Sequence, residues 1–80
     1  MSSLVELAEH LVRGIVRVPD AVSVTPGERN GFDVLVITVD ETDRGVVIGR
    51  QGRTVKAIET ILDAAHRGSE ARPGLDIQTA

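Results

Sequence analysis

The stretch that decides the fold is VVIGRQGRT, residues 46–54, where an apolar run meets one glycine and a second glycine follows two long polar side chains. A plain loop needs no glycine at this spacing, and each glycine inside a helix costs about 1 kcal/mol. The two glycines therefore indicate a backbone that must be bare, in a tight turn or where another chain approaches closely.

After Gly52 the sequence takes the period of a helix. Its apolar stripe consists of Val55, Ile58, Ile61, Leu62 and Ala65. Residues 68–70 (Gly-Ser-Glu) are predicted to end this helix, and residues 75–78 alternate like a short last strand. Because Pro73 stands at its entrance and cannot donate to a strand neighbour, we expect this strand at a sheet edge.

Two strands are predicted before the glycines. Residues 32–39 are rich in β-branched residues and mostly apolar on both faces, which is typical of a central strand. Residues 21–25 alternate as a shorter strand that Pro26 and Gly27 close. Residues 28–31 have turn chemistry, and their Asn-Gly pair predicts a hairpin.

A short helix is predicted between the central strand and the glycines. Asp40 is its expected cap, and Gly45 ends it or marks a bend after about Arg44. Three carboxylates crowd its start, those of Asp40, Glu41 and Asp43. We interpret them as favourable charges at the positive end of the helix dipole and not as a metal site.

The first helix follows a Ser-x-x-Glu capping box at residues 3–6 and is predicted to stop before Pro19. The order is then α-β-β-α-α-β. A tight turn makes the first two strands antiparallel, and the two-helix crossover makes the second and last strands parallel. We expect an α+β fold, with a three-stranded mixed sheet and three helices on one face, in one domain spanning residues 1–80.

Composition argues against several kinds of site. The absence of cysteine leaves no disulfide, thiolate metal site or cysteine nucleophile, and fits the cytoplasm. The N-terminus has no basic leader, and no apolar run approaches the roughly 20 residues of a membrane span, so we expect neither export nor insertion. His10 and His66 have no partner at metal-ligand spacing, and no catalytic set is evident. We predict no metal, cofactor or enzymatic activity.

Charge is distributed unevenly around a formal net charge of -3. Residues 44–56 contain four basic side chains and no acid, whereas the rest of the chain has five basic and twelve acidic residues. The four are Arg44, Arg50, Arg53 and Lys56. A bare turn that opens a helix, with unpaired N–H groups and these cations beside it, suits a sugar-phosphate backbone. The alternative is a purely structural helix-helix turn with Arg50 as a solvated tip.

Residues 47–58, VIGRQGRTVKAI, resemble the Val-Ile-Gly-x-x-Gly-x-x-Ile-x-x-Ile signature of the KH domain, with valine at position 55. The element order resembles the type II, prokaryotic arrangement of that fold. With LVRGIV at residues 11–16 and PDAV at residues 19–22, the chain is similar to the small bacterial single-KH proteins of the KhpA (YlqC-like) family.

The resemblance implies non-catalytic binding of single-stranded RNA, in which a Gly-x-x-Gly loop clamps the backbone of about four nucleotides over an aliphatic groove. Gly49 to Gly52 would be the clamp, and Ile48, Val55 and either Val36 or Thr38 the groove wall. The RNA-binding residues expected from it are Ile48, Gly49, Arg50, Gln51, Gly52, Arg53, Thr54, Val55 and Lys56. With Phe32 as the only aromatic residue, stacking platforms are disfavoured.

The resemblance also implies a bacterial RNA chaperone or post-transcriptional regulator. It implies a homodimer, and a heteromer with a larger KhpB (Jag/EloR)-type KH partner, with consequences for cell elongation and cell-wall homeostasis. An alternative from another class is a protein–protein adaptor or dimerisation module in which RNA binding is weak or secondary.

Overall fold

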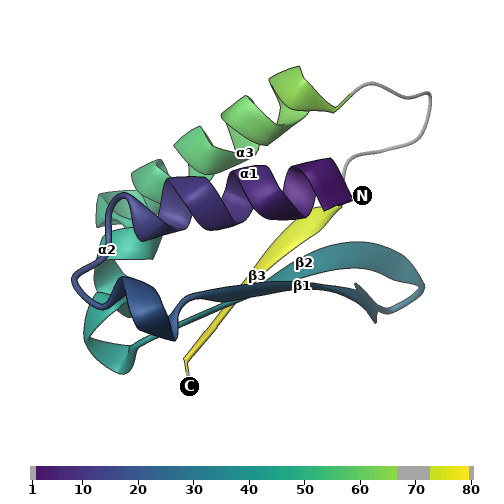
Figure 1. Cartoon of the computed structure of the whole chain (residues 1–80). Helices are drawn as coiled ribbons and strands as arrows, with labels where there is room; N and C mark the ends of the chain where they lie inside the picture. The colour runs from purple at the N-terminus through teal and green to yellow at the C-terminus, as the bar shows by residue number, and fades with distance from the viewer. Residues whose placement is uncertain (1, 67–72, 80) are drawn as a thin grey trace.

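The computed structural model describes residues 2–66 and 73–79, and in this part of the chain two layers pack together (Figure 1). One layer is a sheet, and the other consists of helices that cover one of its faces. The elements in chain order are α1 (Ser2–Arg13), η1 (Pro19–Ala21), β1 (Ser23–Arg29), β2 (Phe32–Val39), η2 (Glu41–Asp43), α2 (Arg44–Ile48), η3 (Arg50–Gly52), α3 (Arg53–Ala65) and β3 (Gly74–Thr79), where η marks a single 3-10 turn.

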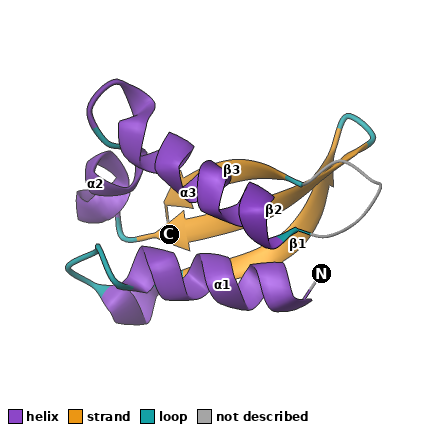
Figure 2. Ribbon diagram, turned by 90° about the horizontal axis from the view of Figure 1, so that it is seen from above, coloured by secondary structure: helices purple, strands orange, loops and turns teal. Residues whose placement is uncertain are grey.

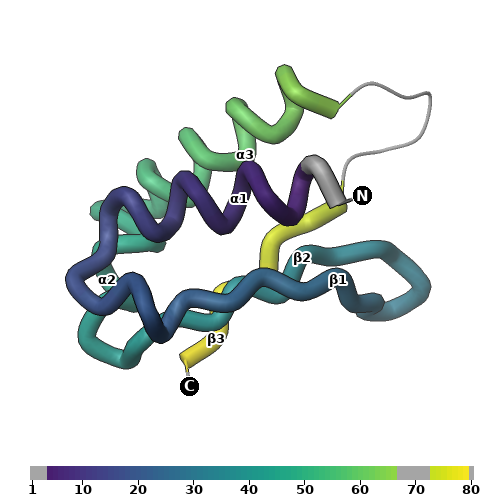
Figure 3. The backbone as a smooth tube through the Cα atoms, in the orientation of Figure 1, coloured from purple at the N-terminus to yellow at the C-terminus, as the bar shows by residue number. Residues whose placement is uncertain are grey.

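The sheet of the described residues has the order β1-β2-β3. β1 pairs antiparallel with β2, from Ser23 opposite Thr38 to Arg29 opposite Phe32. β3 runs parallel to β2. Between these two strands the chain passes through α2 and α3, which lie on the helical side of the sheet; Figure 2 views the sheet from that side, and Figure 3 shows the path of the backbone. The α+β class, the mixed sheet, the central strand and the edge position of the last strand are all confirmed.

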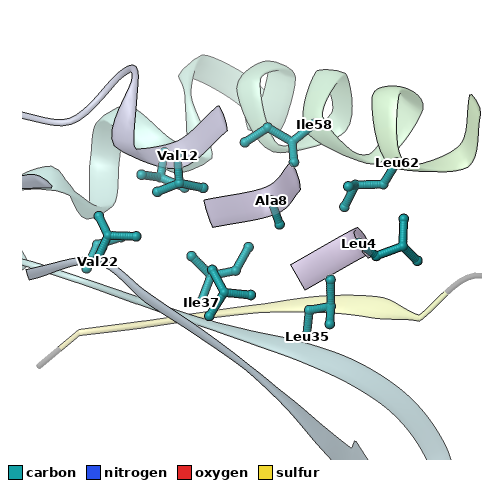
Figure 4. Close-up of a cluster of buried hydrophobic side chains, with 11 residues drawn as sticks. Leu4, Ala8, Val12, Val22, Leu35, Ile37, Ile58 and Leu62 are labelled. Atoms are coloured by element: carbon teal, nitrogen blue, oxygen red, sulfur yellow. The ribbon is translucent and has the colours of Figure 1, made fainter. Parts of the chain in front are cut away.

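The core lies between the helices and the sheet (Figure 4). β2 alternates, so that Leu35, Ile37 and Val39 face the helices and are at most 1% exposed. Against them pack the i, i+4, i+8 residues of α1 and two residues of α3, namely Leu4, Ala8, Val12, Ile58 and Leu62. These periods of two and of about four residues are the ones on which the strand and helix predictions rested.

The prediction that Pro26 and Gly27 close the first strand was wrong. β1 continues through both residues to Arg29. A proline is tolerated there because β1 is an edge strand and its other side carries no neighbour in the described sheet. At Gly27, a Cβ atom would lie 3.1 Å from Cγ2 of Val36, so glycine leaves room for that side chain. The hairpin turn shrinks to Asn30 and Gly31, with φ of 54° and 83°.

The short helix was also misplaced. η2 is capped by Asp40 as expected, but α2 then runs through Gly45 to Ile48 and ends at Gly49. Gly45 has open space around its Cα and needs no special conformation, whereas Gly49 has φ of 79°. The left-handed backbone, and not the first glycine along the chain, ends the helix.

The ends of the two long helices differ from expectation by a few residues. α1 begins at Ser2 and stops at Arg13, so that Ile15 lies beyond it and is 40% exposed. α3 ends at Ala65, and the predicted stop at residues 68–70 lies outside the described residues.

Candidate nucleic-acid interface

The two glycines of the opening stretch lie in the turn that joins α2 to α3, at one end of the molecule (Figures 1 and 2). The β1–β2 hairpin turn lies at the opposite end. Gly49 ends α2, Arg50, Gln51 and Gly52 form the single turn η3, and Gly52 stands immediately before the first residue of α3. The predicted tight turn, with its second glycine opening the long helix, is what the structure contains.

Gly49 is required for two separate reasons. Its backbone, with φ of 79° and ψ of 167°, occupies a region that is open almost only to glycine. A Cβ atom placed on it would also overlap Oγ1 of Thr54 and would lie 2.7 Å from the Thr54 amide nitrogen. Thr54, expected among the RNA-binding residues, therefore packs against the first glycine and fixes how closely α3 approaches the end of α2.

Gln51 and Gly52 both adopt left-handed backbone, with φ of 55° and 74°. A Cβ atom on Gly52 would make only an ordinary contact, 4.0 Å from Cγ1 of Val55, so only the backbone conformation favours glycine there. The amide of Gly52 donates to the carbonyl of Gly49 at 3.1 Å, and the amide of Arg53 donates to the carbonyl of Arg50. These two N–H groups are thus paired inside the turn and do not belong to the unpaired donors that we expected at the start of the long helix.

Three exposed cationic side chains lie in the turn or in the first turns of α3, and a fourth, Arg44, is exposed at the start of α2. Arg50 and Gln51 project from its tip, and both are exposed. Arg53 and Lys56 are three residues apart on α3, so they share one side of its first turns. Arg44, Arg50, Arg53 and Lys56 form no ion pair within residues 2–66 and 73–79. Their charge is therefore not neutralised by a neighbouring carboxylate there.

The aliphatic residues beside the turn divide into two groups. Ile48 and Val55 are half-buried, so each keeps part of its side chain accessible next to the glycines, while Ile58 is in the core. Val36 and Thr38 alternate with the core residues of β2 and lie on the sheet face away from the helices. The structure does not bring these two together with the turn, so that part of the expected groove wall was misplaced.

Asp43 is a feature of this end of the molecule that the sequence did not reveal. Its side chain is fully buried and accepts hydrogen bonds from the backbone amides of Arg17 and Val18, both at 2.9 Å. Asp40, by contrast, is solvated. The hydroxyl and then the amide of Thr42 donate to it and hold the pKa of the Asp40 carboxyl below its ordinary value.

The described residues contain no helix that is both long and apolar enough to span a membrane. In the same part of the chain, no group of three or more His, Cys, Asp or Glu side chains is placed to hold a metal ion.

A Gly-x-x-Gly turn between two helices, above a sheet whose second and third strands are parallel, is the arrangement of a type II KH fold. The family model described as "KhpA/KhpB, KH domain" matches residues 5–77. This chain therefore belongs to the KhpA/KhpB family of KH domains.

Curated relatives agree with that assignment. RNA-binding protein KhpA of Treponema pallidum is 36% identical over 72 residues, which cover 90% of this chain and 90% of that protein. RNA-binding protein KhpA of Thermotoga maritima is 44% identical over 59 residues, covering 74% and 79% of the two chains. That of Streptomyces coelicolor is 46% identical over 61 residues, covering 76% and 77%. No solved structure matches the chain.

Proposed function

We propose that this protein binds single-stranded RNA without catalysis, through the turn of Gly49 to Gly52 and the basic side chains around it. The observation that carries the proposal is the combination of a bare, left-handed backbone with four cations that no carboxylate in the described residues pairs. Relatives that cover most of this chain bear the name RNA-binding protein, which supports the same conclusion.

In this proposal the sugar-phosphate backbone runs over the turn. Arg50, Arg53 and Lys56 contact phosphates, and Gln51 reaches the RNA from the tip of the turn. Bases then lie over the accessible parts of Ile48 and Val55, which offer apolar surface but no ring. Such contacts carry little sequence information, so we expect low specificity and modest affinity that falls as salt rises.

The test is a double variant, Arg50→Asp with Gln51→Asp, titrated against fluorescently labelled single-stranded RNA of mixed sequence at two salt concentrations. Two carboxylates at the tip repel phosphates, so Kd should rise at least about tenfold. The slope of log Kd against log salt should fall by about 0.7 for each phosphate that the variant no longer binds.

The chain offers a matched control at its other end. Arg29→Asp with Asn30→Asp makes the same change in charge beside the hairpin turn. It also removes the surface ion pair between Arg29 and Asp76, which is 2.6 Å long and is expected to contribute at most about 1 kcal/mol. The control should bind RNA as the natural protein does. Equal loss of binding in both variants would mean that net charge, and not the glycine turn, determines affinity.

In the cell we propose that the protein acts in the cytoplasm as an RNA chaperone or post-transcriptional regulator. We further propose that it forms a homodimer and a heteromer with a KhpB (Jag/EloR)-type KH protein, through which it affects cell elongation and cell-wall homeostasis. Sedimentation of the purified chain, alone and mixed with such a partner, tests the two assemblies.

One observation favours the alternative of a protein–protein adaptor. Phe32, the only aromatic residue of the chain, is 74% exposed at the start of β2. It shares the helix-free sheet face with the half-buried Val34 and Val36. Exposed apolar surface of this kind is typical of docking sites. If neither the natural protein nor the acidic variant bound RNA at low salt, the adaptor function would replace RNA binding.

A further inference from the structure

Asp43 is the one fully buried charged side chain within residues 4–66 and 73–79, at 0% exposure. Among these residues no cationic side chain forms an ion pair with it. Its two carboxylate oxygens are each satisfied by one backbone amide, Oδ1 by Arg17 and Oδ2 by Val18, both at 2.9 Å. Burying a carboxylate lowers the stability of the fold strongly unless its oxygens accept hydrogen bonds, as they do here. Such charge-assisted hydrogen bonds are stronger than neutral ones.

The position of Asp43 makes these bonds unusual. It stands immediately before α2, where an aspartate ordinarily caps its own helix, yet its side chain makes no bond to α2. It is instead bonded to residues 25 and 26 positions earlier in the chain, in the connection between α1 and η1. The carboxylate thus joins the connection that follows α1 to the start of α2.

α2 depends on such external support because it has only five residues, too few to be stable alone. Val47, the fourth residue of α2, anchors the helix to the core, since that side chain is fully buried. Asp43 holds its beginning. The far end of α2 is Gly49, whose amide donates to the carbonyl of Gly45 at 2.8 Å and whose Cα lies tightly against Thr54. Any rotation of α2 therefore moves the glycine turn.

We propose that Asp43 is a positioning residue for RNA binding: by bonding the amides of Arg17 and Val18, its carboxylate fixes α2 and thereby the conformation of residues 49–52. This inference rests on the proposed function for its RNA readout, but the effect on the turn exists without RNA. Because coupling between two sites is reciprocal, RNA bound at the turn also tightens the bonds to Arg17 and Val18.

The first experiment compares Asp43→Asn with Leu4→Ala in the full chain. Asparagine keeps the shape of the side chain but replaces one acceptor oxygen by an NH2 group that faces an amide donor. Leu4 is 6% exposed and packs at the end of the core away from Val12 and Val22 (Figure 4), so its truncation lowers stability without touching the Asp43 bonds.

Amide spectra without RNA, and RNA titrations at a temperature where both variants are folded, give the readout. In Asp43→Asn the amide resonances of residues 49–52 should shift and Kd should rise several-fold to about tenfold. In Leu4→Ala the resonances of the turn should stay in place and Kd should stay within about twofold. Turn resonances and Kd in Asp43→Asn that match those of Leu4→Ala would overturn the proposal, leaving Asp43 with a role in stability alone.

A second measurement uses the natural protein and does not depend on a variant folding. The amides of Arg17 and Val18 should exchange with solvent as slowly as those of β2, and saturating RNA should slow them further although they lie outside the turn. Fast exchange in the free protein, or exchange that bound RNA leaves unchanged, would contradict the proposal. A natural protein that binds no RNA would instead remove the proposed function, while the RNA-free spectra of Asp43→Asn still decide whether the carboxylate fixes the turn.

Discussion

At its opposite ends the molecule has two turns in which two successive residues have similar positive φ angles. In the hairpin, Asn30 and Gly31 have φ of 54° and 83°, and before α3, Gln51 and Gly52 have φ of 55° and 74°. Asparagine is several-fold enriched in left-handed backbone because its short polar side chain bonds locally, and glutamine has no such advantage. The residues of the hairpin suit its backbone, whereas Gln51 is a poor choice for its own.

This difference distinguishes a turn whose residues serve the fold from a turn whose residues serve binding. The hairpin turn uses residues that the backbone favours and needs nothing further to explain them. At Gln51 the backbone is strained and the side chain is long and exposed, and backbone strain of this kind gathers where a site must present a group to a ligand. The comparison thus supports the proposed RNA interface at one end of the protein and assigns no RNA contact to the other.

The largest effect is expected from Gly49→Ala. The new Cβ would meet both the side chain and the backbone of Thr54 in a conformation that alanine avoids, so the free energy of unfolding should fall by about 3 kcal/mol or more. Adding Thr54→Ala should not restore stability, because the Cβ and the amide nitrogen of residue 54, both 2.7 Å from the new Cβ, would remain. Urea unfolding measures this, and a loss under about 0.5 kcal/mol would contradict the close approach.

Gly52→Ala should cost less, about 1 kcal/mol, because only the left-handed conformation opposes it. Gly52→Asn should cost less again, since asparagine adopts that conformation more readily. The same urea experiment applies to both. If Gly52→Ala proved as damaging as Gly49→Ala, the two glycines would share one role and the distinction drawn between them would fail.

The smallest effect comes from exchanging residues between the two turns. Gln51→Asn should raise the free energy of unfolding by about 0.5 kcal/mol, and Asn30→Gln should lower it by a similar amount. Their RNA affinities should differ in another way. Gln51→Asn shortens the side chain that reaches the RNA and should weaken binding a few-fold, whereas Asn30→Gln should leave Kd unchanged. Stability changes of the same sign in both variants would remove the basis of the comparison.

The sequence predicted the architecture well because the core elements have strong periods. β2 and the buried positions of α1 and α3 follow alternation and helical spacing, and the turn between two helices follows from glycines flanked by apolar runs. The boundaries were predicted less well where local signals compete with tertiary structure. Pro26 and Gly27 look like a strand end, but an edge strand with Val36 beside it accommodates both.

Two features that bear on the candidate site could not be predicted from the sequence. The bonds of Asp43 join segments 25 and 26 residues apart, and no local pattern signals a carboxylate that leaves its own helix uncapped. Whether Val36 and Thr38 lie on the covered or the open face of the sheet depends on which face the helices cover. The sequence of β2 does not show this, because the strand is mostly apolar on both faces.

The most direct test of the RNA interface is an amide chemical-shift titration of the isotope-labelled protein with a short single-stranded RNA of mixed sequence. We predict that the largest shifts fall on residues 48–56, including both glycines, and that Asn30 and Gly31 do not move. Shifts concentrated at the hairpin and the helix-free sheet face, with residues 49–52 unperturbed, would contradict the claim that the Gly49–Gly52 turn is the RNA interface.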